Sequence, residues 1–184
     1  MDQNIFESDG FTYRVRVGAG KEFHDETESI LTFLDGRAHV KRKYLDKNIP
    51  NATLLAVAYH GDDIVAVCAL KGENGDYTFG IGSKADYPLS RDLPELGYAV
   101  TIEQHRGRDL GKQLNKEIIT RVGGAMYATV RVGNVPEERN LRRCHFRSVG
   151  KHWQGNVDML GLWIRDTDAA ANCDAAPDGP PTID

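Results

Sequence analysis

Residues 95–116, ELGYAVTIEQHRGRDLGKQLNK, combine a strand-like segment, a basic loop with two glycines and the start of a helix. The first eight residues predict a β-strand, and a helix is expected from about Leu110. The first backbone N–H groups of a helix have no intrahelical acceptor and lie at the positive end of its macrodipole. Arg106, Arg108 and Lys112 add full positive charges beside these donors. The stretch therefore predicts a turn that grips the pyrophosphate of a cofactor.

The composition of the whole chain indicates one soluble globular domain. The chain has 184 residues, of which 40% are hydrophobic and 27% charged, as is ordinary for a soluble domain of this length. No run approaches the roughly 20 apolar residues of a membrane-spanning helix. The first ten residues are acidic and polar, so we expect neither a secretory signal nor a transit peptide there. A formal net charge of −4 argues against a general nucleic-acid coat.

The three cysteines predict no metal site. Cys68, Cys144 and Cys173 are odd in number, lie far apart and lack the paired spacing of zinc ligands. We therefore expect reduced thiols and a cytoplasmic setting. Cys68 lies in an apolar segment and is expected to be buried, and Cys144 is expected to be an inert packed thiol on a basic helix.

The segments around the central stretch predict a mixed α/β domain over residues 11–165. Further strands are expected over 11–17, 53–60, 63–70, 125–132 and 159–165, and helices within 22–47, broken at 35–36, and over 138–149. Residues 71–94 are rich in Gly, Asp, Ser and Pro, and predict a long loop near the substrate opening with one short strand at 77–81. Residues 1–10 are expected to be a flexible N-terminus, and 166–184 a disordered tail.

The order of these elements resembles the GNAT superfamily of acyl-coenzyme A dependent N-acyltransferases. The central stretch is similar to the motif of that family, which is often written ELxYxVxPxYRGxGxGxxL. The residues that match its loop are Arg106, Gly107, Arg108, Leu110 and Gly111. The resemblance implies a central, mostly antiparallel sheet that is splayed at its middle strands and flanked by helices. It also implies transfer of an acetyl or other acyl group from coenzyme A to a primary amine, by direct attack in a ternary complex.

The resemblance further implies which residues hold the acyl-coenzyme A. Backbone groups of Val100, Thr101 and Ile102 would pair with the pantetheine arm as if it were an added strand. The loop residues that would hold the pyrophosphate are Arg106, Gly107, Arg108, Asp109, Leu110, Gly111 and Lys112. Asn140 is near the Asn that opens the last helix in the family and contacts the cofactor there.

Asp109 stands where the family usually has a glycine, and a carboxylate there would repel a pyrophosphate. One interpretation is that Asp109 points outward and caps the following helix by accepting a backbone N–H. The other interpretation is that the loop no longer binds coenzyme A.

The resemblance places Glu95 where many members keep a Glu that takes the amine proton through water. The alternative for Glu95 is a surface charge at a strand edge. Glu103 is a second candidate at the far end of the strand. Phe146 stands where many members have the tyrosine that protonates the leaving thiolate, so His145 is the nearest substitute.

The identity of the acceptor stays open between a small amine and a macromolecule. Basic residues in 37–47 are either a solvated helix face or the border of an anionic acceptor. A stripe at 139, 143, 147 and 151 is either a solvated face or meets the 3′-phosphate of coenzyme A or an anionic acceptor such as nucleic acid. A catalytically weakened binding module and a nucleic-acid modifying member are therefore alternative functions. Trp153 is expected in a loop beside the acceptor cleft. A monomer and a homodimer are both compatible with the sequence.

Overall fold

A computed structural model describes residues 3–18, 24–167 and 173. Within them, eight strands form one sheet and five α-helices flank it. The strands are β1 (Gln3–Ser8), β2 (Phe11–Val17), β3 (Leu54–His60), β4 (Asp63–Leu70), β5 (Glu95–Thr101), β6 (Met126–Arg131), β7 (Arg147–Gln154) and β8 (Met159–Arg165). The α-helices are α1 (His24–Leu34), α2 (Arg42–Asn48), α3 (Gly75–Ala85), α4 (Leu110–Val122) and α5 (Val135–Arg143).

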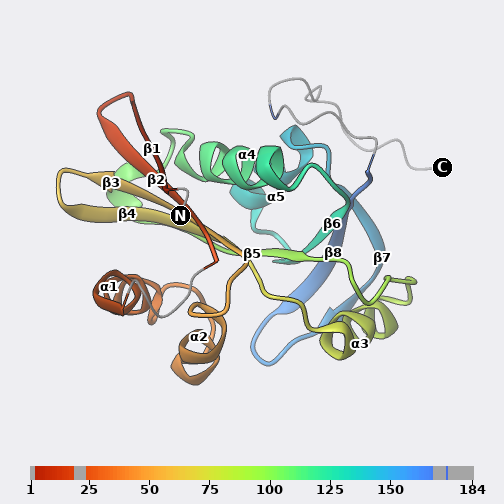
Figure 1. Cartoon of the computed structure of the whole chain (residues 1–184). Coiled ribbons are helices and arrows are strands. Elements are labelled where there is room, and N and C mark those ends of the chain that lie inside the picture. The colour runs from red at the N-terminus through yellow and green to blue at the C-terminus, as the bar shows by residue number, and fades with distance from the viewer. Residues whose placement is uncertain (1–2, 19–23, 168–172, 174–184) are drawn as a thin grey trace.

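The sheet is mostly antiparallel, with strand order β1-β2-β3-β4-β5-β6-β8-β7. Its one parallel pair is β5 with β6. Helices α4 and α5 cover one face, and α1, α2 and α3 cover the other (Figure 1). The mixed α/β fold class, with a mostly antiparallel sheet between helices, is therefore confirmed. None of the described helices is long and apolar enough to cross a membrane.

The central helix α4 is held by an apolar stripe. Leu110, Leu114 and Ile118 recur at four-residue spacing and are fully or almost fully buried. They pack with residues of β3, β4 and β5 in the largest core cluster. Because Leu110 is the first residue of the helix, this packing also fixes the loop that precedes it.

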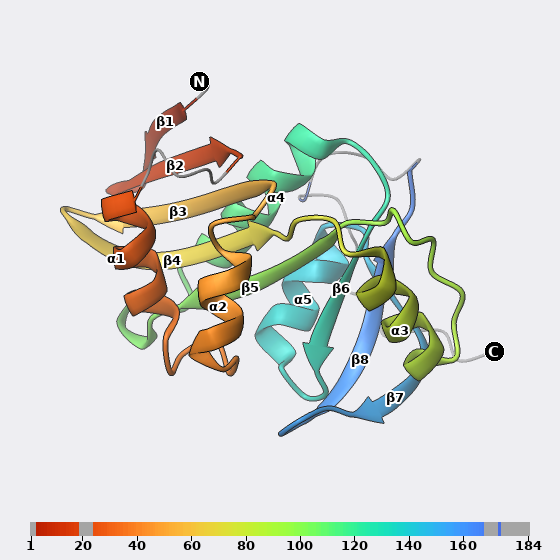
Figure 2. The same cartoon turned by 60° about the horizontal axis from the view of Figure 1, so that its bottom comes forward.

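The sheet opens between its two middle strands. Strand β5 pairs with β6 only through Glu95 with Tyr127 and Leu96 with Ala128. Two residues later, Tyr98 has a φ of 54°, a left-handed conformation that is rare for a bulky residue inside a strand. The β4–β5 register shifts at the same level, so β5 bulges and turns away from β6. The two strands consequently diverge, as Figure 2 shows.

The predicted loop over 71–94 contains a helix, and the expected strand at 77–81 is wrong. Asn74 caps α3, since its side-chain oxygen accepts a hydrogen bond from the N–H of Tyr77. Asp86 ends the helix in the left-handed conformation. Ile81 and Ala85 are buried against β7 and β8. The sequence did not predict this helix, because three of its residues are glycines and glycine lowers helix propensity.

The last helix is shorter and earlier than predicted. Pro136 lies in its first turn, where proline is favoured. His145, with a φ of 64°, adopts the left-handed turn that follows the helix, before β7 begins. Residues 147 and 151 are thus on a strand, so the predicted basic stripe on one helix is wrong. Trp153 is also on β7 and is only 8% exposed, so it is a core residue and not part of a loop.

Three further expectations differ from the structure. Residues 3–8 form β1, paired with β2 along its length, so this part of the N-terminus is strand and not a flexible segment. Residues 37–41 precede α2 instead of belonging to a helix. Cys144 and Cys173 form a disulfide, whereas Cys68 is free and buried as expected. A disulfide favours an oxidising compartment, and the cytoplasmic location stays a prediction. Apart from 166, 167 and 173, the predicted tail lies outside the described residues.

Gly150 is a position where a side chain should be costly. It has a φ of 66°, and a Cβ there would overlap the carbonyl oxygen of Ala85 at the end of α3. Gly123 has a similar φ of 65° but open space around it. We expect Gly123→Ala to lower the free energy of unfolding by about 1 kcal/mol, from conformation alone. Gly150→Ala should lower it by about 3 kcal/mol, because overpacking against backbone is added. Equal losses in denaturant titrations would contradict the close packing of α3 on β7.

Candidate acyl-transfer site

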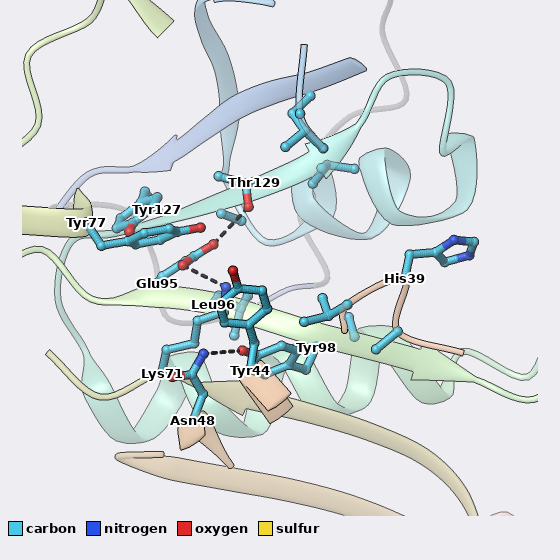
Figure 3. Close-up of a pocket in the computed structure, with 18 of the residues that line it drawn as sticks. His39, Tyr44, Asn48, Lys71, Tyr77, Glu95, Leu96, Tyr98, Tyr127 and Thr129 are labelled. Carbon is cyan, nitrogen blue, oxygen red and sulfur yellow. Dashed lines mark hydrogen bonds and ion pairs between the residues drawn. The ribbon is translucent and has the colours of Figure 1, made fainter. Parts of the chain in front are cut away.

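A cavity of about 1040 Å³ opens where β5 and β6 diverge. Its floor is formed by β5 and β6. Its walls come from residues 37–51, from the segment that begins α3 and from the β7–β8 hairpin. Figure 3 shows polar side chains from several of these elements converging on this space. Ligand sites are typically concave spaces with a few convergent polar groups, so this cavity is the candidate site.

Glu95 lies at the floor of the cavity and is only 4% exposed. One carboxylate oxygen accepts a hydrogen bond of 2.8 Å from the Thr129 hydroxyl on β6. The other is 2.7 Å from the Lys71 ammonium nitrogen. These two interactions appear as dashed lines in Figure 3. Glu95 is therefore a buried, oriented carboxylate, and the alternative of a surface charge at a strand edge is wrong.

Lys71 reaches Glu95 by lying across β5 at Gly97. A Cβ on Gly97 would be 2.7 Å from the Lys71 Cε, so a larger residue at 97 would require the end of the Lys71 side chain to shift. Burial lowers the pKa of Lys71, but Glu95, with Tyr77 and Tyr98, more than offsets this and raises the pKa above its ordinary value. Lys71 is thus a cation at neutral pH, and its charge balances Glu95 inside the cavity.

Three tyrosines surround this ion pair. The Tyr98 hydroxyl accepts a hydrogen bond of 2.7 Å from the Asn48 amide on α2. The Tyr127 hydroxyl is 3.2 Å from the Thr78 hydroxyl on α3. Burial, and then the charge of Glu95, raise the pKa of both Tyr77 and Tyr127. Their phenols are therefore neutral hydrogen-bond donors at neutral pH. The sequence did not single them out, because only the folded sheet brings them to Glu95.

The free edge of β5 differs in detail from the prediction. The Ile102 N–H donates to the Val65 carbonyl oxygen at 3.0 Å, so it is used by β4. Backbone groups of an antiparallel strand alternate in direction, so those of Val100 also face β4. Those of Ala99 and Thr101 face the gap toward β6. Of the three residues expected to pair with pantetheine, only Thr101 has its backbone groups at the open edge.

The basic loop leads from β5 to the start of α4. Asp109 has a φ of 55° and occupies the N-cap position, but its side chain accepts no backbone N–H. An N-cap side chain normally acts from an extended backbone conformation, which explains why the predicted capping is wrong. The 60% exposed carboxylate lies 3.5 Å from the Lys112 ammonium and 3.8 Å from an Arg143 guanidinium nitrogen. These cations partly neutralise the charge that would repel a pyrophosphate.

Several residues predicted to bind the cofactor do meet at one place. A Cβ on Gly111 would be 3.0 Å from the Asn140 amide nitrogen and 3.8 Å from the Thr101 hydroxyl. The start of α4, the end of β5 and helix α5 therefore converge at Gly111. Glycine allows this close approach and leaves the first N–H groups of α4 uncovered by a side chain.

The other predicted catalytic residues lie apart from the cavity. Glu103 is in a short 3-10 turn after β5, and neither Glu103 nor His145 lines the cavity. Phe146 follows the end of α5 and is buried in the core. In the structure the left-handed turn that closes α5 is at His145, and the residue four positions before it is Leu141, which is also buried. Helix α5 thus contains no tyrosine, whereas Tyr77 and Tyr127, from other elements, line the cavity.

One carboxyl group that the sequence did not single out lines the cavity from α5. The Asn115 amide donates to Glu137 at 3.3 Å, and the Cys68 thiol donates to Asn115 at 3.2 Å. Burial raises the pKa of the Glu137 carboxyl group. This chain of polar groups ties the start of α5 to the core beneath β5.

If the loop holds the pyrophosphate of acetyl-coenzyme A, as the family resemblance implies, removing the charge of Asp109 should strengthen that binding. We expect Asp109→Asn to lower the Kd for acetyl-coenzyme A about fivefold, since the interaction of two unit charges about 4 Å apart is worth about 1 kcal/mol in water. Asp86→Asn is the matched control, because Asp86 has the same φ of 55° and an ion pair with Lys151 at 3.4 Å. Calorimetric titration measures both. Weaker binding by Asp109→Asn alone would show that the carboxylate holds the loop in its binding form.

Comparisons with solved structures identify the fold. The chain is similar to Arabidopsis thaliana NAA60 in complex with a bisubstrate analogue, with 13% identity over 86% of this chain and 99% of that one, and a TM-score of 0.61. It is similar to Escherichia coli ElaA, with 11% identity over 85% and 99%, and a TM-score of 0.62. A GNAT family acetyltransferase from Elizabethkingia anophelis with acetyl-CoA bound has 13% identity over 86% and 99%, and a TM-score of 0.55. No family model and no curated protein sequence matches the chain. Its structural neighbours across the chain are thus GNAT-family acetyltransferases, and the likeness establishes the fold.

Proposed function

We propose that this chain, which has the fold of the GNAT-family acetyltransferases, transfers an acyl group from acyl-coenzyme A to a primary amine. The observation that carries the proposal is the position of Glu95. A buried, ion-paired carboxylate lies at the floor of a cavity, where the free edge of β5 begins. A buried carboxylate held by polar partners inside a cleft is a typical candidate for a general base.

The residues present fit an acyl-coenzyme A. Backbone groups of Ala99 and Thr101 on the open edge of β5 would pair with the pantetheine arm. The N–H groups at the start of α4 would hold the pyrophosphate, with Arg106 and Arg108 beside them. Asn140 would close over Gly111. The bound cofactor supplies an activated thioester.

Glu95 would take the proton that the attacking amine loses. Lys71 holds the Glu95 carboxylate in place through the ion pair of 2.7 Å. Lys71 also disfavours the charged form of a nearby ammonium, which promotes loss of the acceptor's proton.

The neutral phenols of the cavity would donate to the negative charge that develops on the acyl oxygen or the thiolate. Tyr127 is already bonded to Thr78, whereas Tyr77 is 45% exposed and lies at the cavity wall. We therefore assign the proton donor to Tyr77 in place of His145. A direct reaction within a ternary complex fits the chain, since its free thiol, Cys68, is buried in the core.

The binding-module alternative rests on Asp109, whose carboxylate lies in the phosphate loop. A transfer assay separates the two functions. The protein is incubated with acetyl-coenzyme A and a panel of primary amines, and both free thiol and the mass of the acylated amine are followed. The enzyme proposal predicts amine-dependent thiol release with a matching acylated product. Absence of transfer together with failure to bind acetyl-coenzyme A would contradict the enzyme and support the binding module.

A further inference from the structure

One wall of the cavity is strongly cationic. Between α1 and the end of α2, the residues that line it include Arg37, His39, Lys41 and Lys47. No carboxylate from this segment lines the cavity. Arg37 is anchored by a hydrogen bond of 2.9 Å to the carbonyl oxygen of Phe33. Figure 3 shows His39 well separated from Glu95 across the cavity, so the wall and the buried carboxylate are distinct features.

Four of the other charges that line the cavity are paired. Lys71 pairs with Glu95 at 2.7 Å, and Arg131 pairs with Asp158 at 4.0 Å. Two further acidic residues line the cavity without an ion pair among the described residues: Glu73, before α3, and Glu137, at the start of α5, which accepts a hydrogen bond from the Asn115 amide on α4.

The three permanent cations of the wall also have no ion pair among the described residues. No carboxylate of residues 5–18 or 26–167 lies within 4.0 Å of Arg37, Lys41 or Lys47. Positive charge without a carboxylate partner is therefore gathered on the wall formed by residues 37–47, whereas Glu73 and Glu137 lie on other elements.

We propose that the acceptor is a small amine that also carries an anionic group, a carboxylate or a phosphate. Its anionic group lies against Lys41 and Lys47, and its amine reaches Glu95. This inference rests on the proposed function, which supplies the amine. The volume of about 1040 Å³ is large enough for an acceptor that spans from the wall to the floor. A simple cationic amine would be repelled by the wall, whereas the anionic group of an acidic amine is attracted to it.

Matched pairs of acceptors test the proposal. O-phosphoethanolamine is compared with ethanolamine, and 4-aminobutyrate with butylamine, so that phosphate and carboxylate are separate arms. Binding to the protein is measured by calorimetry with and without coenzyme A, and kcat/KM is measured with acetyl-coenzyme A. We expect the anionic member of at least one pair to be favoured tenfold or more. Equal or weaker binding of both anionic members would overturn the inference.

Lysine variants test whether the preference for anionic acceptors comes from this wall. The double variant Lys41→Gln, Lys47→Gln should reduce the preference to about twofold or less. Lys84→Gln is the control, because Lys84 is an exposed lysine at the end of α3 that does not line the cavity. A preference that survives the double variant would overturn the assignment. A single-stranded oligonucleotide that binds this wall while neither acidic amine does would also overturn it, in favour of a macromolecular acceptor.

Failure of this inference can be told apart from failure of the proposed function. Transfer to the simple amines and to the acidic amines at equal rates would remove the acidic acceptor and leave the enzyme. Failure to bind acetyl-coenzyme A would remove the enzyme. Calorimetry without coenzyme A would then still decide whether the wall selects acidic amines.

Discussion

Replacing Glu95 with Gln is expected to lower kcat by about 100-fold or more, as is typical when a general base is lost. The Kd for acetyl-coenzyme A should stay within about twofold, because Glu95 lies at the floor of the cavity and not in the phosphate loop. Steady-state kinetics and calorimetry measure the two effects. An unchanged kcat would remove Glu95 from the mechanism.

The free energy of unfolding of Glu95→Gln must also be measured, because this variant leaves the buried Lys71 ammonium without its carboxylate partner. Combining it with Lys71→Met removes the stranded charge, and this double variant should recover stability without recovering activity. Thr129→Val keeps the carboxylate and removes only its hydrogen bond from β6. It should therefore reduce kcat much less than Glu95→Gln. A loss equal to that of Glu95→Gln would show that orientation, and not proton transfer, is what Glu95 provides.

A proline at Thr101 is expected to raise the Kd for acetyl-coenzyme A tenfold or more. Proline removes a backbone N–H, and the N–H of Thr101 faces the gap beside β6, where the pantetheine arm would pair. The hydrogen bonds between β4 and β5 are kept. Val100, which precedes the new proline, already has the extended conformation that a residue before proline requires. Binding is measured by calorimetry on folded protein. Wild-type affinity would contradict the role of this strand edge.

The neighbouring residue gives the matched control. Ile102→Pro removes the N–H that donates to the Val65 carbonyl oxygen at 3.0 Å. It should lower the free energy of unfolding by about 1–3 kcal/mol, because a buried acceptor loses its partner. The two prolines, one residue apart, should therefore separate cofactor binding from sheet stability. Equal losses in the free energy of unfolding for the two variants would show that the N–H groups of Thr101 and Ile102 do not face opposite edges of β5.

The sequence predicted those helices and strands whose bounds depend on the local pattern of apolar and turn residues. The apolar arms of β3 and β4 around a tight turn, and the step from β5 to α4, follow from residue pattern and were predicted close to their observed bounds. Helix α3 was missed because its caps, Asn74 and Asp86, outweigh a glycine-rich interior. The end of α5 was missed because His145 adopts a conformation that sequence reasoning reserves for glycine.

The site was only partly predictable, for a physical reason. Glu95 and the loop residues lie in one continuous stretch, so a motif could point to them. Lys71, directly after β4, and Thr129, on β6, reach Glu95 from distant parts of the sequence, so no local motif could point to them. The direction of backbone groups on β5 depends on pairing with β4, so the sequence could not separate Thr101 from Val100 and Ile102.

The central claim is that the open edge of β5 and the loop before α4 form an acyl-coenzyme A site. Thermal unfolding across a titration of acetyl-coenzyme A tests it most directly. A ligand that binds only the folded state adds about 2.7 kcal/mol at 100 times its Kd. We therefore predict a midpoint that rises steadily with ligand concentration and rises further in Asp109→Asn. A midpoint that does not move at millimolar acetyl-coenzyme A would contradict the account.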